Sequence, residues 1–140
     1  MTGEHDPVHT YLISRGCAPL VARRGLSGLL EHWASLVAAA ERGRDASLDE
    51  WLNDMDLRDI LAGALAAATP RERAAAALRL AQADARFVAL TEPSSCLWGD
   101  EIARTNSWRP EWQWWYFRRP LVPGPALRED LLVNGLLRTD

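Results

Sequence analysis

Residues 69–90 read TPRERAAAALRLAQADARFVAL, and this stretch decides the fold class that the sequence predicts. Thr69, Pro70 and Glu72 combine a helix N-cap, a proline at the first helical position and the carboxylate of a capping box. Apolar residues then cover a broad arc at helical spacing up to about Leu90. Because the many alanines in this arc allow another helix to approach closely, we expect this helix to lie at the centre of a bundle.

One carboxylate, Asp84, falls inside the apolar arc of this helix. Burying an uncompensated charge is costly, so a carboxylate in that position must be paired, protonated or located at the rim of the core. Arg73 lies on the same side of the helix. The pattern therefore predicts that Asp84 is not an isolated buried charge.

Two further helices are predicted nearer the start of the chain. Asp6 followed by Pro7 is typical of a helix start, so we expect a short helix over residues 7–15. Apolar residues repeat at helical spacing from Leu26 to Ala40 and predict a second, longer helix that ends at a glycine. Residues 19–24 form either the first turns of that helix or a separate turn.

A capping box at Ser47 and Glu50 predicts a helix that opens at Leu48. Its apolar residues do not continue in phase, because two sets lie on nearly opposite sides of one ideal helix: Leu48, Trp51, Leu52 and Met55, then Leu57, Ile60, Leu61, Ala64 and Leu65. A straight helix with one buried face would leave one set in water. We therefore expect a break near residues 53–56.

The chain becomes irregular after Pro93. Residues 92–107 are polar, and one helical turn is expected at residues 99–104. Residues 108–120 read WRPEWQWWYFRRP, for which we favour a helix that begins at Pro110 and gives way to extended chain, although alternation of the aromatics also fits a strand. A last helix is expected over residues 126–134. The sequence as a whole predicts an all-α single-domain bundle, residues 1–140, of five or six helices with this Trp-rich irregular segment, or a short strand, packed on one side.

Composition limits the classes of protein that fit. The 140 residues are 48% hydrophobic and 25% charged, as in ordinary globular domains. No uncharged apolar run is long enough to span a bilayer and no secretion signal opens the chain, so we expect a cytoplasmic protein with no membrane partner. All sixteen basic residues are arginine, which is typical of a bacterial genome rich in G and C. Cys17 and Cys96 are expected to be reduced thiols.

The first candidate site is an acidic run between Asp45 and Asp59, where six carboxylates stand against Arg58 alone. Such a patch steers and holds a basic partner, and the partner-binding residues that it predicts are Asp49, Glu50, Asp54, Asp56 and Asp59. The alternative is that these residues cap helices and form a solvated face. The run lacks the glycine and terminal glutamate of a calcium-binding loop, so we expect no metal there.

The second candidate site is the Trp/Arg segment, residues 104–120. Arginines interleaved with aromatic rings are typical of protein interfaces and of surfaces that grip phosphates and stack bases, but tryptophans also close cores. We expect Trp98, Trp112 and Trp115 to cover the bundle. The residues predicted to contact a partner here are Arg104, Trp108, Arg109, Trp114, Arg118 and Arg119.

Catalytic and metal-binding patterns are weak. His5 and His9 have the spacing of a metal pair but lack further ligands, so we expect no cofactor and no metal. Residues 93–96, PSSC, offer a nucleophile without the glycines of a nucleophile elbow, and an enzyme would require Cys96, His32 and Asp84 to meet.

Three functions follow from these patterns. The leading hypothesis is a protein that acts by binding another macromolecule, for example an immunity- or antitoxin-like protein whose acidic patch occupies a basic site on a toxin. The second is recognition of a nucleotide or single-stranded nucleic acid by residues 104–120. The third is a small hydrolase or transferase that uses Cys96, although we favour a protein without catalytic activity.

Overall fold

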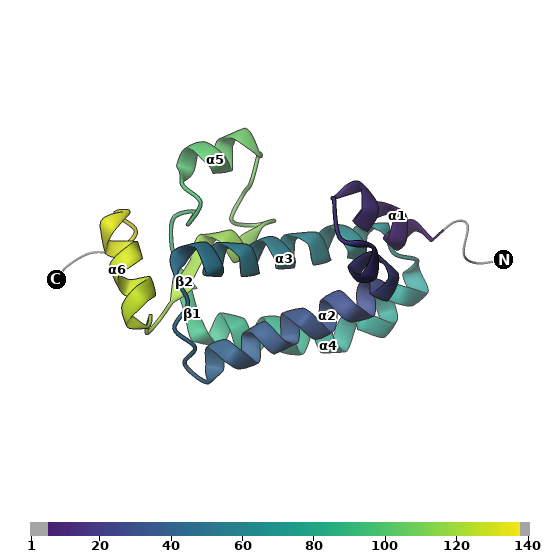
Figure 1. Ribbon diagram of the computed structural model, residues 1–140, viewed down its shortest axis with the longest axis horizontal. Helices are drawn as coiled ribbons and strands as arrows, with labels where there is room; N and C mark the ends of the chain where they lie inside the picture. Colours follow the sequence, from purple (N-terminus) through teal and green to yellow (C-terminus); the bar gives the residue numbers. More distant parts are fainter. Residues whose placement is uncertain (1–5, 138–140) are drawn as a thin grey trace.

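The computed structural model describes residues 6–137 and confirms the all-α class (Figure 1). Six α-helices are joined by short loops, one 3₁₀ helix and one two-stranded antiparallel sheet. The elements in chain order are α1 (Pro7–Ser14), α2 (Pro19–Glu41), α3 (Leu48–Ala67), α4 (Pro70–Leu90), β1 (Thr91–Pro93), α5 (Asp100–Thr105), the 3₁₀ helix η1 (Trp114–Phe117), β2 (Arg118–Pro120) and α6 (Pro125–Val133).

The helix starts predicted at Asp6, Ser47 and Thr69 are confirmed. The Asp6 carboxylate accepts hydrogen bonds from the backbone N–H groups of the first turn of α1. Both halves of the capping box are present at the start of α3 and again at the start of α4. In α2, Gly25 has a φ of 63°, so the helical residues before it form separate first turns that meet the main helix at a kink.

Helix α3 is continuous, and the break expected near residues 53–56 is wrong. The helix packs against α1, α2, η1 and α6, so it is covered on several sides. At Gly63, a Cβ atom would overlap the Tyr11 hydroxyl, which shows how closely α1 approaches. The apolar residues change phase because successive parts of α3 face different neighbours. Leu57, Ile60 and Leu65 are partly buried against the core while Leu61 and Ala64 are fully buried.

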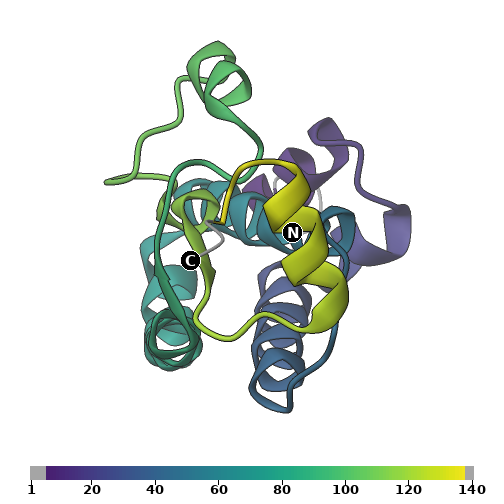
Figure 2. The same ribbon diagram turned by 90° about the vertical axis from the view of Figure 1, so that its left-hand side faces the viewer.

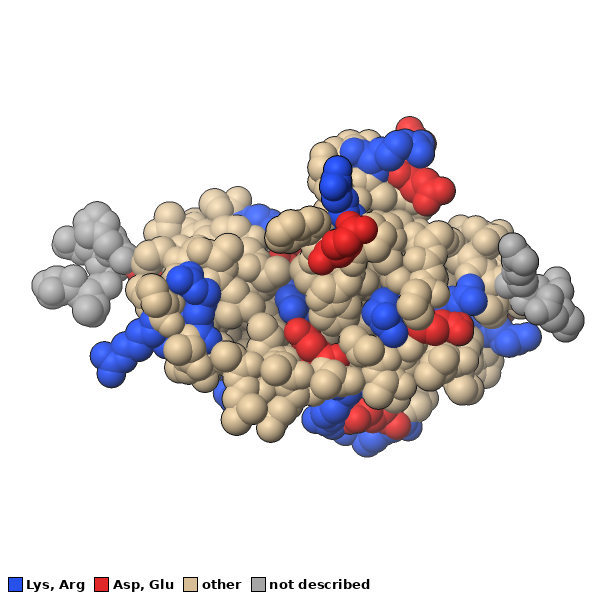
Figure 3. All heavy atoms as spheres, turned by 180° about the vertical axis from the view of Figure 1, so that it is seen from behind, with Lys and Arg blue, Asp and Glu red and all other residues tan. Residues whose placement is uncertain are grey.

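Helix α4 lies on the outside of the bundle beside α2, so the expectation that it is the central helix is wrong. Figure 2 shows α2 and α4 side by side under α3. Only Ala76, Ala83 and Phe87 of α4 are buried, and Leu78 on its outer face is 69% exposed. The side of the molecule on which α4 lies presents mainly uncharged surface (Figure 3). Alanine permits close helix packing, but it is also compatible with a solvent-exposed helix face. Most of the alanines of α4 are exposed to solvent.

The last third of the chain closes one end of the bundle. Strands β1 and β2 pair with Thr91 opposite Pro120. The Asp45 carboxylate accepts from the Ala126 backbone N–H at the start of α6, and the Asp130 carboxylate of α6 accepts from the Leu48 backbone N–H at the start of α3. These reciprocal contacts fix α6 to the α2–α3 connection. The position of α6 agrees with the predicted last helix.

The Trp-rich stretch does not form the predicted helix from Pro110. A turn precedes the 3₁₀ helix η1, which runs directly into β2. Trp115 and Tyr116 are adjacent in sequence and both are buried in η1, where Trp115 contacts the Arg58 guanidinium and the Tyr116 hydroxyl donates to Asp56. These contacts with α3 therefore prevail over the helix-start signal at Pro110.

Candidate binding surfaces

Residues 98–113 form an arm that projects from the bundle around α5 (Figures 1 and 2). Gly99, the second residue of the arm, has a φ of 100°, which directs the chain away from the core. The base of the arm is fixed by Ala103, which is buried, and by Trp108, whose ring stacks on the Tyr116 ring at a centroid distance of 4.0 Å. The Trp98 indole also donates to the carboxylate of Asp56 on α3. The arm is therefore a fixed projection.

The outer part of the arm carries exposed apolar and basic side chains. Trp112 is 70% exposed, so the expectation that it covers the bundle is wrong. Arg104 and Arg109 are exposed and form no ion pair within residues 6–137. Both line a hollow of about 380 Å³ together with Trp108. The structure thus brings together three of the residues that the sequence predicts for partner contact.

The remaining predicted residues of the Trp/Arg segment lie elsewhere and act internally. The Arg118 guanidinium donates to the hydroxyl and the carbonyl oxygen of Thr91 at 2.7 and 3.0 Å. Arg119 pairs with Glu92 across the sheet and also donates to a backbone carbonyl near the C-terminus. Trp114 is half-buried, with its ring centroid 6.0 Å from that of Phe87. These three residues support the fold and do not extend the surface of the arm.

An ion pair between α3 and α4 lies against the Trp-rich stretch. Arg58 of α3 is 5% exposed and donates through Nε and Nη2 to both carboxylate oxygens of Asp84 of α4, at 3.0 and 2.9 Å. The Trp33 indole donates to the same carboxylate at 2.9 Å. The Arg58 guanidinium carbon lies 4.6 Å from the centroid of the Trp115 ring, within cation–π range. This cluster joins α2, α3 and α4 to the Trp-rich segment.

The cluster confirms that Asp84 is paired, but the partner is Arg58. Arg73 instead donates to the carbonyl of Ala68 near the α3–α4 connection. Sequence reasoning missed Arg58 because it counted this residue only as the single base of an acidic run. A signal was present, since Arg58 follows Trp51 by seven residues and therefore continues the buried stripe of α3.

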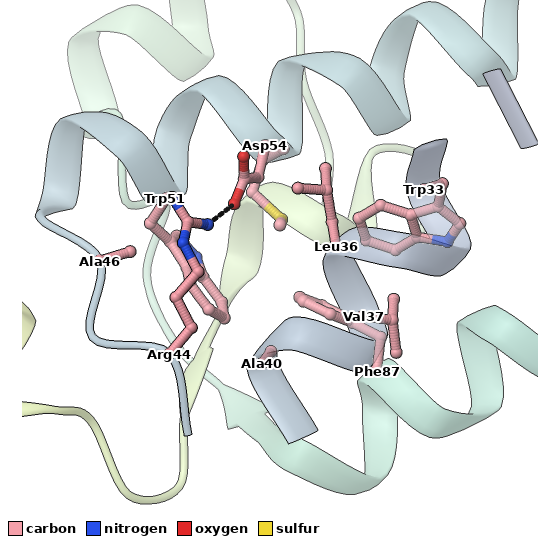
Figure 4. A pocket seen from close by; sticks show the side chains of 10 residues that line it. Trp33, Leu36, Val37, Ala40, Arg44, Ala46, Trp51, Asp54 and Phe87 are labelled. Carbon is pink, nitrogen blue, oxygen red and sulfur yellow. Dashed lines mark hydrogen bonds and ion pairs between the residues drawn. The ribbon is translucent and has the colours of Figure 1, made fainter. Parts of the chain in front are cut away.

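Most of the predicted acidic residues are engaged within the molecule. Arg44 pairs with Glu50 and Asp54 at 2.9 and 3.2 Å, and Figure 4 shows its side chain reaching Asp54 across the end of α3. The small hollow below it has a volume of about 20 Å³, room for one water. Glu50 also caps α3, and burial raises the pKa of Asp54, an effect that Arg44 partly offsets.

The acidic residues on the other side of α3 also contact groups within the molecule. Asp59 lies 3.6 Å from Arg15, and burial raises the pKa of this carboxyl despite that guanidinium. The Asp56 carboxylate accepts from the Tyr116 hydroxyl at 2.6 Å, and burial together with this bond raises the pKa of the tyrosine. Asp49 is exposed. The acidic run is therefore mainly a set of internal contacts, with Asp49 facing water.

The residues proposed for catalysis or metal binding are not brought together. His32 is exposed on α2, Cys96 is buried at the start of the arm, and Asp84 is held by Arg58. Burial raises the pKa of the Cys96 thiol, which disfavours the reactive thiolate. Within residues 6–137, no group of three or more His, Cys, Asp and Glu side chains is placed to hold a metal ion. His5, the other member of the predicted histidine pair, lies outside the described residues.

The two cysteines are free thiols, as expected. None of the helices in the described part of the chain has the length and apolar character needed to cross a bilayer. No family model, curated protein or solved structure matches this chain. The function proposed for it therefore depends on the chemistry of its own surfaces, of which the arm is the most distinctive.

Proposed function

We propose that this chain acts by binding another protein through the arm. The observation that carries the proposal is the exposure of Trp112 at 70% on a fixed projection that also presents Arg104 and Arg109. Tryptophan and arginine are the residues that most often dominate the energy of protein interfaces. A fixed arm also reduces the entropy lost on binding, because few groups have to become ordered.

The charges of the arm favour a protein over a nucleic acid. Arg104 and Arg109 stand against three exposed carboxylates on the same arm, those of Asp100, Glu101 and Glu111. Nucleic-acid binding depends on neutralising phosphates, and single-strand binding depends on a basic groove. Because Arg118 and Arg119 are engaged in internal contacts, they do not add to the positive charge of the arm.

An immunity- or antitoxin-like role is one form of this proposal, with a toxin as the partner. The contact surface that we favour is the arm, and not the acidic residues of α3. Asp54 and Asp59 are paired and partly buried, so a basic partner that used them would have to displace Arg44 and Arg15. The arm requires no such exchange, because its two arginines form no ion pair within the described residues.

The proposal is tested by site-specific photo-crosslinking in the cells that express the chain naturally. A benzophenone amino acid replaces Trp112 in one variant and Val133, an exposed apolar residue on α6, in a control variant. We expect a discrete protein adduct from position 112 alone, and its yield should fall in an Arg104→Ala/Arg109→Ala background. Adducts of the same mass and yield from both positions, or an adduct only from a crosslinker placed at Asp49, would remove the arm from the proposal.

A further inference from the structure

The hollow on the arm (Figure 1) is lined by residues of α5 and of the loop that follows it. These residues are Asp100, Ala103, Arg104, Ser107, Trp108 and Arg109. The two arginines form no ion pair within residues 6–137. The hollow therefore presents two guanidinium groups to whatever the arm binds, and guanidinium groups form their strongest hydrogen bonds with anionic oxygens.

The charge of the hollow distinguishes between kinds of anion. Among the described residues of its lining, one carboxylate, that of Asp100, stands against the two arginines, so the formal charge is plus one. Glu101 and Glu111 are exposed on the arm outside this lining. A carboxylate neutralises a charge of plus one, whereas a phosphate ester, which carries nearly two negative charges, leaves an excess beside Asp100. The charge therefore favours a carboxylate.

The backbone around the hollow is held by local hydrogen bonds. The Trp108 and Ser107 N–H groups donate to the carbonyls of Ala103 and Arg104 at 2.9 and 3.1 Å. The Arg109 N–H donates to the side-chain oxygen of Gln113 at 3.0 Å. Because the backbone positions of both arginines are fixed in this way, mainly side chains have to become ordered on binding.

Ser107 adds a polar group to the hollow at a strained position. It is the one residue other than glycine that has a positive φ, 56°, within residues 6–137. It follows the end of α5, where glycine is the usual residue, since glycine adopts a positive φ without strain. A glycine there would leave the hollow without the hydroxyl donor that Ser107 supplies.

The exposed Trp112 ring lies close to this hollow along the chain. The Trp112 N–H donates to the Arg109 carbonyl at 3.0 Å, so residues 109–112 form a turn whose end residues are within about 7 Å of one another. In an extended peptide, side chains two positions apart lie on the same face, about 7 Å apart. The hollow and the ring therefore match two such side chains of an extended segment.

We propose that the arm binds an extended segment of its partner in which an Asp or Glu residue and an apolar residue lie two positions apart. The carboxylate pairs with Arg104 and Arg109 and accepts a hydrogen bond from the Ser107 hydroxyl, and the apolar side chain covers Trp112. This inference rests on the proposed function, because it names the chemistry of the partner that the arm binds.

The test is a titration of the full chain with N-acetyl-Leu-Ala-Glu-Ala-Leu-amide, a probe with a leucine two positions from the carboxylate on either side. Its binding is followed in ¹⁵N–¹H spectra by the indole signal of Trp112, identified with Trp112→Phe, and by the backbone amides of Ser107 and Arg109. We expect saturable shifts at millimolar concentration. The same probe with Gln in place of Glu should bind about five-fold more weakly, because it forms no ion pair.

Variants of the lining separate the carboxylate contacts from the fold. Arg104→Gln and Arg109→Gln should each weaken binding of the Glu probe, and Arg128→Gln should preserve it, because Arg128 is an exposed arginine on α6. Ser107→Gly should weaken binding about two-fold while it keeps or raises the urea denaturation midpoint, since glycine relieves the positive φ. Equal weakening by the Arg109→Gln and Arg128→Gln variants would overturn the inference.

A probe with phosphoserine in place of Glu tests the choice of anion. The wild type should bind it no more tightly than the Glu probe. Asp100→Asn, which raises the formal charge of the hollow to plus two, should make the phosphoserine probe the tighter ligand. Tighter binding of phosphoserine by the wild type would contradict the assignment of a carboxylate.

The probes and the photo-crosslinking test different claims. A discrete adduct from position 112 together with equal binding of the Glu and Gln probes would keep the arm as the binding surface and overturn the carboxylate inference. Saturable binding of the Glu probe without any adduct from position 112 would support the chemistry of the hollow and contradict the proposed function.

Discussion

The two halves of the Trp-rich stretch both combine tryptophan with arginine, but they lie in different environments. Residues 108–113 lie in the arm, where Trp112 is exposed, whereas residues 114–120 return to the bundle, where Trp115 is 4% exposed. Three positions separate these two tryptophans. The difference lies in what each half meets, because Trp115 reaches the Arg58 guanidinium and Trp112 reaches solvent. An aromatic-rich stretch is therefore not by itself either a core or an interface.

The same contrast applies to the arginines. Arg58 and Arg118 are held by side-chain and backbone acceptors inside the fold. Arg104 and Arg109 occupy the exposed hollow of the arm. We infer that the inner set stabilises the protein and the outer set contacts a partner, which predicts that stability and binding depend on different residues.

The largest expected effect separates the two tryptophans directly. Trp115→Ala should lower the free energy of unfolding by about 3–5 kcal/mol, because it removes a large buried ring and leaves a cavity. Trp112→Ala should change it by less than about 0.5 kcal/mol, as is usual for exposed positions. Urea denaturation followed by circular dichroism measures both. Similar losses in the two variants would mean that the arm packs on the bundle in solution.

A somewhat smaller effect is expected for the buried ion pair. Arg58→Met should destabilise the protein by about 3 kcal/mol, because it removes the ion pair and both guanidinium hydrogen bonds from the partly buried Asp84 side chain. The double variant Arg58→Met/Asp84→Leu should recover part of that loss. Arg109→Met on the arm is the matched control and should leave the denaturation midpoint unchanged. A loss that persists fully in the double variant would show that Arg58 contributes through its contacts with the rings alone.

The acidic side chains of α3 predict a pH effect. Burial raises the pKa values of Asp54 and Asp59 in the folded state, so folding favours their protonated forms. These two carboxyls therefore bind more protons in the folded protein than in the unfolded chain, and their contribution to stability is lost as pH rises from below about 4 through the raised folded-state pKa values. Asp54→Asn/Asp59→Asn should remove this contribution, measured as the difference from the wild type in denaturation at a series of pH values. Asp49→Asn, on the exposed side, should keep the wild-type dependence, and an identical dependence in the double variant would contradict the burial of these carboxyls.

The smallest expected effect is on a reaction rate, the alkylation of Cys96. It compares the base of the arm, where Cys96 lies, with the tip, where Trp112 lies. Cys96 is buried where the arm begins, and burial raises the pKa of its thiol. In a Cys17→Ser background, we expect alkylation of Cys96 by iodoacetamide at neutral pH to be much slower than that of a free thiol, while iodide still quenches Trp112. Mass spectrometry follows the alkylation. Rapid reaction of Cys96 would show that the base of the arm opens.

Local signals predicted the helix starts well, because capping depends on residues close in sequence. Asp6, Ser47 and Thr69 each cap the helix that the sequence assigns to them. The errors arose where contacts with another element determine the path or the placement of a helix. The change of phase in α3 predicted a break but reflects contact with different elements, and the alanines of α4 fit a central helix and an outer helix equally well.

The sequence reasoning on the candidate sites has the same limit. It predicted Arg104, Trp108 and Arg109 as partner contacts because their composition is typical of an interface, and the structure places these three residues together on the arm. It did not predict that Trp112 is the exposed ring, because helical and strand spacing gave different answers for residues 108–117. The pairing of Arg58 with Asp84 joins residues 26 positions apart, so only the packing of α3 on α4 reveals it.

The most direct test of the division between the two halves is the triple variant Arg104→Ala/Arg109→Ala/Trp112→Ala, assayed for capture of the arm-crosslinked partner. The quantity to measure is the yield of that partner per folded molecule, with the fold checked by the urea denaturation curve. We predict that the partner is lost while the denaturation curve overlays that of the wild type. Retention of the partner at the wild-type yield would contradict the assignment of the arm as the binding surface.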